Sequence, residues 1–399
     1  MFPFAKISYF SFMKYNFDYF KARLLNKIGL LQEEHQNSIE EVQEEINLPI
    51  EYTSRFSLYS VQSIEQILGR EHELKLLKTA YDNWQITKDN LLITGELGSG
   101  VTSFLLSGTA YFPHAKVIES STPVSNHKAL VSILSEKLNI KEATKLTDIQ
   151  KHILSSEEEH VIIFENIEHL FVRKIHGFTL LEDFLLFMHS TKEKIFWIGS
   201  ISSYGLYYLD RVFSLSSNFN HVIHLKPISQ QIITDLFFKR NEGYEIIYLK
   251  PKTPNTNLNN KLKNASSEEK QTILKNYYLT KLHDFSNGNI SRALLFMKNS
   301  AIRLVDKNVY IKPFENTEIG DLSLDELFIL EAVMQHGALS QKDIKDIFRN
   351  SSKSIRLSIE NLLEKNLILI SNQKEITINL LYHSDLKSLM HSILNRNFK

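Results

Sequence analysis

The chain has 399 residues, enough for two or three domains, and its 43% hydrophobic and 23% charged residues are typical of a globular protein. Lysine plus arginine and aspartate plus glutamate number 46 each, so the net charge does not attract the chain to nucleic acid or an anionic membrane, and such binding would need a local patch. The absence of cysteine excludes disulfides, thiolate zinc sites and cysteine nucleophiles, and it fits a reducing, cytoplasmic setting.

Residues 1–60 are predicted to form an aromatic and acidic helical extension. Nine of the first twenty residues are aromatic; residues 2–20 therefore form either a helix packed on the body of the protein or an arm that docks on a partner or a membrane surface. Residues 32–47 are rich in glutamate, as in a solvated helix or linker. No apolar run approaches the ~20 residues needed to cross a bilayer, and the apolar core of a secretory signal is missing.

Residues 61–228 alternate between short apolar runs and amphipathic segments. The apolar runs predict strands at 90–94, 116–119, 160–164, 194–199 and 221–225. The segments around them predict a helix ending near 84 and helices at 102–110, 127–138, 147–154 and 178–189. This alternation predicts an α/β fold, a parallel sheet with helices on both faces.

The first strand leads into Gly95-Glu96-Leu97-Gly98-Ser99-Gly100-Val101-Thr102, which matches the phosphate-binding loop of P-loop NTPases at every fixed position but one. In this pattern the glycines turn successive amides toward one anion, the following helix adds its positive end, and the threonine hydroxyl reaches Mg²⁺. We therefore predict a P-loop NTPase core whose nucleotide-binding residues are Gly95, Gly98, Ser99, Gly100, Val101, Thr102 and Ser103, with Thr102 also at the metal.

The exception is Val101, which stands where the pattern has lysine. That lysine normally reaches the β- and γ-phosphates, so its loss forgoes a charge-assisted bond of ~1.5–3 kcal/mol, or roughly ten- to a hundredfold in affinity. The amides, the helix end and Thr102 still favour binding of ATP or ADP with Mg²⁺.

Residues 229–312 are predicted to form a helical lid, with a polar stretch at 251–271 that indicates a surface insertion, ordered or disordered. Residues 313–399 are predicted to form a winged helix-turn-helix domain, with helices at 324–334, 341–348 and 352–365 and strands at 367–371 and 375–379.

A winged helix raises the question of DNA. Its recognition helix would present Lys353 and Arg356, and its wing Lys374, to DNA phosphates. Acidic and basic residues are nearly balanced in this domain, however, and winged helices also dock proteins. DNA binding and protein docking both stay open.

Four segments together resemble the AAA+ and STAND ATPases, in particular their origin-recognition, replication-initiator branch. They are Gly69-Arg70-Glu71, the loop at 95–102, the apolar strand that ends in Glu165-Asn166, and Gly288-Asn289-Ile290-Ser291-Arg292-Ala293. The resemblance covers about residues 60–399 and leaves the first sixty without a match.

The resemblance implies a catalytic centre that this chain has altered. The family has Asp-Glu at the end of that strand, where Asp holds Mg²⁺ through water and Glu deprotonates the attacking water. Glu165 has the charge for the metal role with one methylene more, whereas Asn166 can orient water but cannot take its proton. The following Glu168-His169 resembles a Glu-His pair of some STAND members.

The resemblance also implies roles for residues outside the loop. Ser200 matches the sensor-1 position; the other interpretation is a serine that caps a strand-to-loop turn. Arg292 matches the sensor-2 arginine and would be the main cation left near the γ-phosphate. Arg211 lies where the family often presents an arginine to a neighbouring subunit, and Arg70 is more often a structural contact.

Other chemistries are disfavoured. His221 and His224 are three apart on a predicted strand, so they point to opposite faces and make a poor metal chelate. The chain contains no Gly-x-Ser-x-Gly elbow of a serine hydrolase.

The sequence thus predicts an ATP-binding, AAA+/STAND-like protein that acts as a nucleotide-dependent switch or scaffold with slow or absent hydrolysis, and that has a protein partner or self-associates. Two alternatives stay open. One is an active ATPase that uses Arg292 or Arg211 as a substitute cation, and the other is a DNA-binding initiator or loader that acts through the winged helix.

Overall fold

The computed structural model describes residues 48–112, 114–119, 123–124, 126–252, 254–314, 319–349 and 352–397. The aromatic segment 2–20 and the glutamate-rich segment lie outside the described residues, so the docking-arm hypothesis stays a prediction.

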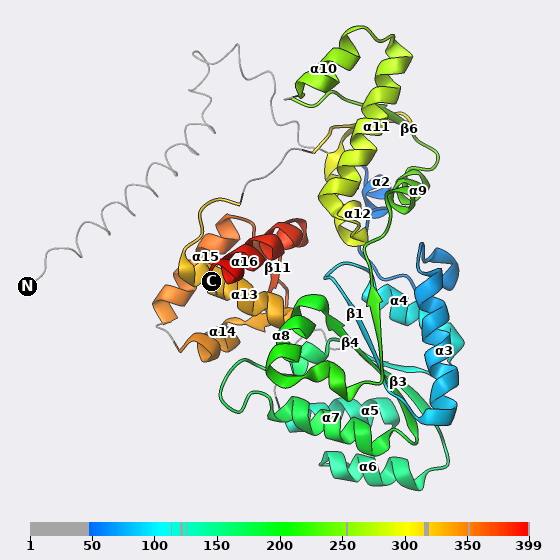
Figure 1. Ribbon diagram of the computed structural model, residues 1–399, viewed down its shortest axis with the longest axis vertical. Helices are drawn as coiled ribbons and strands as arrows, with labels where there is room; N and C mark the ends of the chain where they lie inside the picture. The colour runs from blue at the N-terminus through cyan, green and yellow to red at the C-terminus, as the bar shows by residue number, and fades with distance from the viewer. Residues whose placement is uncertain are drawn as a thin grey trace, which may run out of the picture. The chain divides into compact units, whose positions relative to one another are not determined.

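A five-stranded parallel sheet in the order β2-β3-β4-β1-β5 forms the first domain (Figure 1). Its strands are β1 (Leu91–Gly95), β2 (Lys116–Ile118), β3 (His160–Phe164), β4 (Ile195–Ser202) and β5 (His221–Leu225). The predicted strand positions are confirmed, and β4 runs three residues further than predicted. This order places β1 between β4 and β5, so the loop after β1 lies inside the sheet's carboxyl edge rather than at its end.

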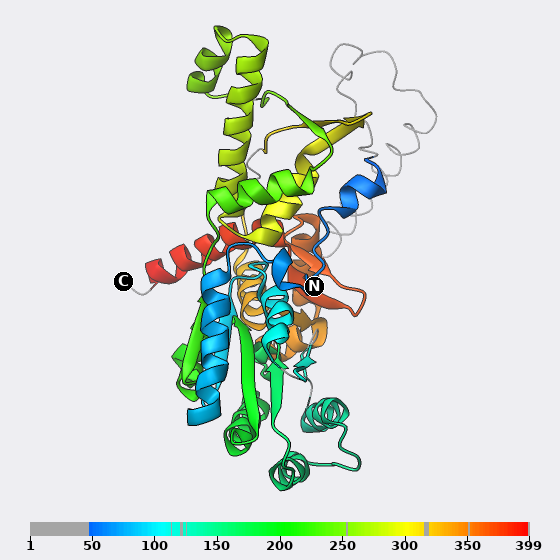
Figure 2. The same cartoon turned by 90° about the vertical axis from the view of Figure 1, so that its right-hand side faces the viewer.

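Alternate strand residues pack on opposite faces of this sheet, as expected for strands buried on both sides. On one face Leu91 and Ile93 pack with helices α3 (Glu71–Thr87) and α4 (Val101–Gly108). On the other, Leu92 packs with α5 (His127–Leu138), α6 (Leu146–Ser155), α7 (Thr179–Thr191) and α8 (Ser203–Phe213). Figure 2 shows α3 and α5 on opposite sides of the strands. The predicted α/β fold of a P-loop NTPase core is confirmed.

The lid, defined here as α9 to β8, contains a small sheet in addition to the predicted helices. Its helices are α9 (Gln230–Arg240), α10 (Thr256–Lys263), α11 (Ser267–Ser286) and α12 (Ile290–Ser300). A small sheet, β6-β8-β7, joins them and consists of Glu245–Tyr248, Asn308–Ile311 and Ala301–Val305. These strands have four or five residues each, too few for their period to stand out from the helical pattern around them.

The polar stretch 251–271 is ordered rather than disordered over its described residues. The Asn255 side chain caps α10 by accepting the amide of Leu258 at 2.8 Å, and Ser266 and Glu269 form a capping box at the start of α11. Leu258 and Leu262 are buried in the lid core. Two leucines at helical spacing and two caps therefore order a segment whose composition is mostly polar.

The segment before the sheet also packs on the lid. Helix α2 (Ile50–Ser54) buries Tyr52 in the lid core, where its hydroxyl donates to Asn241 Oδ1 at 2.8 Å. Short 3₁₀ turns complete the first domain at Ile64–Gln66, Thr109–Tyr111, Ile167–Leu170 and Leu215–Asn218.

The C-terminal domain, α13 to α16, has the helices and hairpin expected for a winged helix. Its elements are α13 (Leu324–His336), β9 (Ala338–Ser340), α14 (Gln341–Phe348), α15 (Ser352–Glu364), β10 (Ile368–Ile370), β11 (Glu375–Ile378), a 3₁₀ turn η5 (Leu380–Tyr382) and α16 (His383–Asn397). The sheet order is β10-β11-β9, with both pairs antiparallel. The sequence pattern predicts neither β9 nor α16, and α16 becomes important below.

In the part of the chain that the structure describes, no helix is long and apolar enough to cross a membrane.

Candidate functional site

The loop after β1 has the backbone of an anion-binding turn. Gly98 and Gly100 have φ angles of +82° and +91°, which glycine adopts without strain. The amide of Ser99 donates back to Glu96 O at 2.9 Å, and α4 begins at Val101 with no side-chain cap from Gly100. The first amides of α4 therefore have no acceptor within the helix and point out of its positive end.

Thr102 and Glu165 meet at the inner side of this loop. The Thr102 side chain lies close enough to the Glu165 carboxyl to lower its pKa through hydrogen bonding. The pKa of Glu165 is raised to about 7, mainly by burial and also by the nearby Glu119, while hydrogen bonding with Thr102 acts to lower it. Glu165 Oε1 and Ser99 Oγ are buried without a hydrogen-bond partner. A hydroxyl and a carboxylate with a spare oxygen beside a phosphate loop fit Mg²⁺, which takes one or two carboxylates plus phosphate oxygens.

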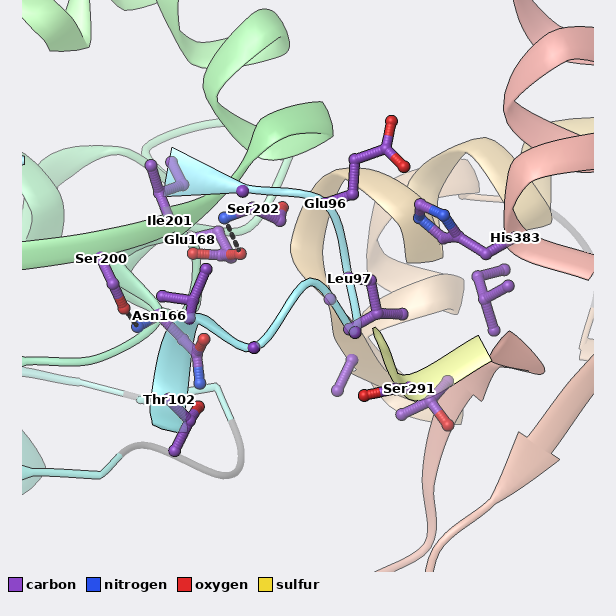
Figure 3. A pocket seen from close by; sticks show the side chains of 18 of the residues that line it. Glu96, Leu97, Thr102, Asn166, Glu168, Ser200, Ile201, Ser202, Ser291 and His383 are labelled. Carbon is purple, nitrogen blue, oxygen red and sulfur yellow. Dashed lines mark hydrogen bonds between the residues drawn. The ribbon is translucent and has the colours of Figure 1, made fainter. Parts of the chain in front are cut away.

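Asn166 and Ser200 join Thr102 in one cavity. Asn166 follows β3 in the left-handed region, at φ +57°, and its amide donates to Ser200 Oγ at 3.2 Å (Figure 3). Ser200 lies within β4 and is buried, so it does not cap a turn at the strand's end. Thr102, Glu165, Asn166 and Ser200 are called the inner wall below. The structure brings these predicted site residues together.

Glu168 is a further buried carboxylate in this cavity. Its Oε1 accepts the Ser202 amide at 2.8 Å, while Oε2 has no partner, and burial raises its pKa. In Figure 3 it lies beside Ser202, across the cavity from His383. The only sequence signal for it is its place in the Glu-His pair after Asn166, which assigns it no role.

The cavity has a volume of about 350 Å³ and is lined by all three domains. Besides the loop and three residues of the inner wall, Thr102, Asn166 and Ser200, it is lined by Ser291 from the start of α12 and by residues of the C-terminal domain, namely Val333, Met334, Gly337, Ala338, Thr377, Ile378 and His383. Any ligand in it would therefore contact the sheet domain, the lid and the C-terminal domain at once.

The lid holds the phosphate loop by its backbone carbonyls. Asn289 Nδ2 donates to Leu97 O at 2.8 Å, and the Ser291 amide donates to Gly98 O at 3.1 Å. The same Asn289 caps α12, because its Oδ1 accepts the Arg292 amide at 3.1 Å. Sequence reasoning missed this role, although an Asn directly before a helix is a recognisable N-cap signal.

The C-terminal domain contacts the same loop. Lys387 of α16 forms an ion pair with Glu96, and a Cβ on Gly98 would lie 2.9 Å from Leu380 Cδ1. His383 lines the cavity from the start of α16; burial lowers its pKa to about 4, so the ring is neutral at pH 7. Asn289, Ser291, Leu380, His383 and Lys387 are called the outer contacts below.

Arg292 points away from the cavity. Its guanidinium is buried, donates to Leu381 O at 2.9 Å and pairs with Asp385 at 3.3 Å, which joins the lid to the C-terminal domain. The Nε and Nη1 atoms of Arg292 are buried and have no hydrogen-bond partner. The structure thus places Arg292, the arginine predicted to contact the γ-phosphate, between two domains. Contact of Arg292 with phosphate stays a prediction.

The other predicted arginines lie outside the cavity. Arg211 donates to the hydroxyl of Tyr207 at 3.0 Å on α8, and its presentation to a second subunit stays a prediction. Arg70 is buried and donates to Lys226 O at 2.6 Å and to Ser99 O at 3.2 Å, a structural contact that supports the loop.

The candidate DNA contacts remain predictions. Arg356 is exposed and paired with Glu360 on its own helix at 2.8 Å, and Lys374 lies in the turn before β11 at φ +64°. The side chain of Lys353 lies outside the described residues. Among the residues that the structure describes, no group of three or more His, Asp or Glu side chains could hold a metal. His221, one of the two histidines considered above as metal ligands, has its Nε2 3.4 Å from Asp89 Oδ2.

A second, mainly apolar cavity adjoins the phosphate loop on the far side of Gly100 and Ser103. Four residues line both cavities, namely Leu58, Gly100, Ser103 and Ser291. The apolar lining of the second cavity comes from the segment before α3, from α4, from Ile228 and from the lid: Val61, Ile67, Leu68, Phe104, Ile228, Ile232, Leu236, Ile290 and Leu294. An apolar slot beside an anion-binding loop suits a flat ring attached to phosphates.

No family model and no curated protein matches the chain. Among solved structures it is similar to Cdc6p from Pyrobaculum aerophilum, with 14% identity, a TM-score of 0.44 and coverage of 87% of this chain and 98% of that one. It is also similar to a Walker-type ATPase of Pyrococcus abyssi, with 14% identity, a TM-score of 0.42 and coverage of 84% and 99%. The Aeropyrum pernix ORC2 protein, in ADPNP and ADP complexes, follows with 11% identity, a TM-score of 0.39 and coverage of 86% and 98%. At TM-scores below 0.5 these likenesses give no evidence of function.

Proposed function

We propose that this protein binds ATP or ADP with Mg²⁺ and acts as an AAA+/STAND-like conformational switch with slow or absent hydrolysis. The observation that carries the proposal is the cavity at the phosphate loop, which is lined by Thr102, the neighbour of Glu165, and by residues of the lid and the C-terminal domain.

Binding is supported by the division of the site into two parts. The phosphates would meet the amides of the loop and the end of α4, and the base would enter the apolar slot beside Gly100. Thr102 and Glu165 would hold Mg²⁺, which screens the charge of the phosphates when it is bound.

Weak hydrolysis follows from the inner wall. Asn166 lies next to Ser200 at the position of the expected general base, and an amide cannot take a proton from water. Removing such a base costs roughly 10²–10⁴ in rate. The loop also lacks its lysine, so less charge is available to stabilise the transition state.

Switching is supported by the outer contacts. Nucleotide in the cavity would touch Ser291 and His383 together with the loop, so its presence or absence changes the free energy of the closed arrangement of the three domains.

Calorimetry on the full chain tests the proposal. ATP and ADP with Mg²⁺ should both bind, and Thr102→Ala should weaken binding about tenfold or more because it removes a metal-side hydroxyl. Thr109→Ala is the matched control, since its hydroxyl only bonds to Leu106 O. No heat of binding in the wild type would refute the proposal. Phosphate release at micromolar enzyme, abolished by Thr102→Ala, would replace the switch with an active ATPase.

A further inference from the structure

The phosphate loop lacks a lysine of its own, but a lysine lies against it. Val101 cannot contact phosphate through charge, and its Cγ2 lies only 2.9 Å from where a Cβ on Gly95 would stand, so the side chain packs against the loop. Lys387 reaches the loop from α16 and pairs with Glu96. The two residues are 291 positions apart in the sequence.

The position of α16 is fixed at three points near its start. Leu380 packs on Gly98, Asp385 pairs with Arg292, and Asn287 Nδ2 donates to Ser384 Oγ at 3.4 Å. Residues four apart share one face of a helix, so Lys387 stands one turn beyond the cavity-lining His383, on the same face. The helix is therefore held with its lysine toward the phosphate loop.

Lys387 is the cation around the loop that is best placed to meet a phosphate, because Arg70 is buried and donates to the carbonyls of Lys226 and Ser99. His383 is neutral at pH 7, and Arg292 is turned toward Asp385. The Glu96 carboxylate would repel phosphates, and in this structure it forms an ion pair with Lys387. The lysine side chain is flexible, so its ammonium can exchange one anionic partner for another.

We propose that Lys387 supplies, from the C-terminal helix, the phosphate-binding charge that Val101 does not, and that it passes from Glu96 to the β- and γ-phosphates of the bound nucleotide. This inference rests on the proposed nucleotide binding and deepens it. It makes α16 the element that senses the terminal phosphates, and Glu96 the group that competes with them.

Titration calorimetry of ATP with Mg²⁺ on the full chain tests this. Lys387→Met should weaken binding roughly ten- to a hundredfold, the value of one charge-assisted bond. Glu96→Gln should tighten binding, because it frees Lys387 and removes a negative charge. Lys374→Met, a lysine in the wing of the same domain, is the matched control and should bind as the wild type does.

The variants separate a phosphate ligand from a mere latch between α16 and the loop. A latch predicts that Lys387→Met and Glu96→Gln change affinity in the same direction, which would overturn the proposal, as would wild-type affinity in Lys387→Met. Adding Val101→Lys to Lys387→Met returns the charge but not the contact with Glu96, so recovered affinity supports the proposal and persistent loss refutes it. No ATP binding in the wild type would instead refute the proposed function itself.

Discussion

The inner wall and the outer contacts meet the same phosphate loop, yet they are built differently. The inner wall comes from one sheet, where the carboxyl ends of β1, β3 and β4 lie side by side. The outer contacts come from two other domains, with Asn289 and Leu97 192 residues apart in the sequence. The inner wall has a hydroxyl and a carboxyl at Thr102 and Glu165 and an amide at Asn166, while Lys387 reaches the loop from the C-terminal domain. The proposed binding of nucleotide therefore depends on domain docking as much as on the loop.

The largest expected effect concerns His336, which seats the C-terminal domain on the sheet domain. Its Nε2 accepts the Arg173 amide at 3.1 Å, its Nδ1 donates to Ala332 O at 2.7 Å, and its ring stacks on Phe171 at 4.5 Å. Burial lowers the pKa of His336 to about 4; Arg173 and His169 push it down as well, and the Ala332 bond and Asp343 oppose them.

Protonation of His336 should therefore release the domain that carries the outer contacts. The unfolded chain binds this proton near pH 6.5 and the folded chain only near pH 4, so the stabilisation is complete above pH 6.5 and falls, by about 3 kcal/mol in all, toward pH 4. Urea midpoints by circular dichroism from pH 7.5 to pH 4.5 measure this. His336→Phe keeps a ring on Phe171 and should make the profile less steep, leaving the contribution of His383, whose pKa burial also lowers to about 4; an equally steep profile would contradict the prediction.

The sequence predicted the inner wall because local rules suffice there. A glycine loop after an apolar strand fixes the turn, and the carboxyl ends of neighbouring parallel strands must meet, which places Thr102, Glu165 and Ser200 together. The outer contacts follow no such rule. Lys387 lies on a helix that the pattern did not predict, and the partner of Arg292 depends on how two domains dock. The strands of the lid were not predicted because they are too short for their period to stand out. Helix α10 was not predicted because its sequence is mostly polar.

A smaller effect is expected at Gly98, where the outer contacts press on the loop. A Cβ there would lie 2.9 Å from both Asn289 Oδ1 and Leu380 Cδ1, whereas one on Gly100 would meet only Ile290 Cδ1 at 3.7 Å. Both glycines have positive φ, so alanine is strained at either position. Gly98→Ala should therefore cost about 1 kcal/mol more than Gly100→Ala, as a small overpacking of flexible side-chain ends. Thermal melts without nucleotide compare the stability of the two variants. Equal losses of stability would mean that the outer contacts do not restrict the space around Gly98.

The smallest effect is expected at Asp385, whose pair with Arg292 spans the lid and the C-terminal domain. Asp385 is 63% exposed and Arg292 keeps its bond to Leu381 O, so Asp385→Asn should cost only about 0.2–1 kcal/mol. Glu360→Gln, which breaks the exposed pair with Arg356 inside one helix, is the matched control. Global stability should hardly separate the two variants. Hydrogen exchange should, because only Asp385→Asn loosens a contact between domains: amides at 288–292 and 380–385 should exchange faster in it and be unchanged in Glu360→Gln. Equal exchange in both would mean that Leu381 alone holds Arg292, and that the charge of Asp385 adds nothing to the outer contacts.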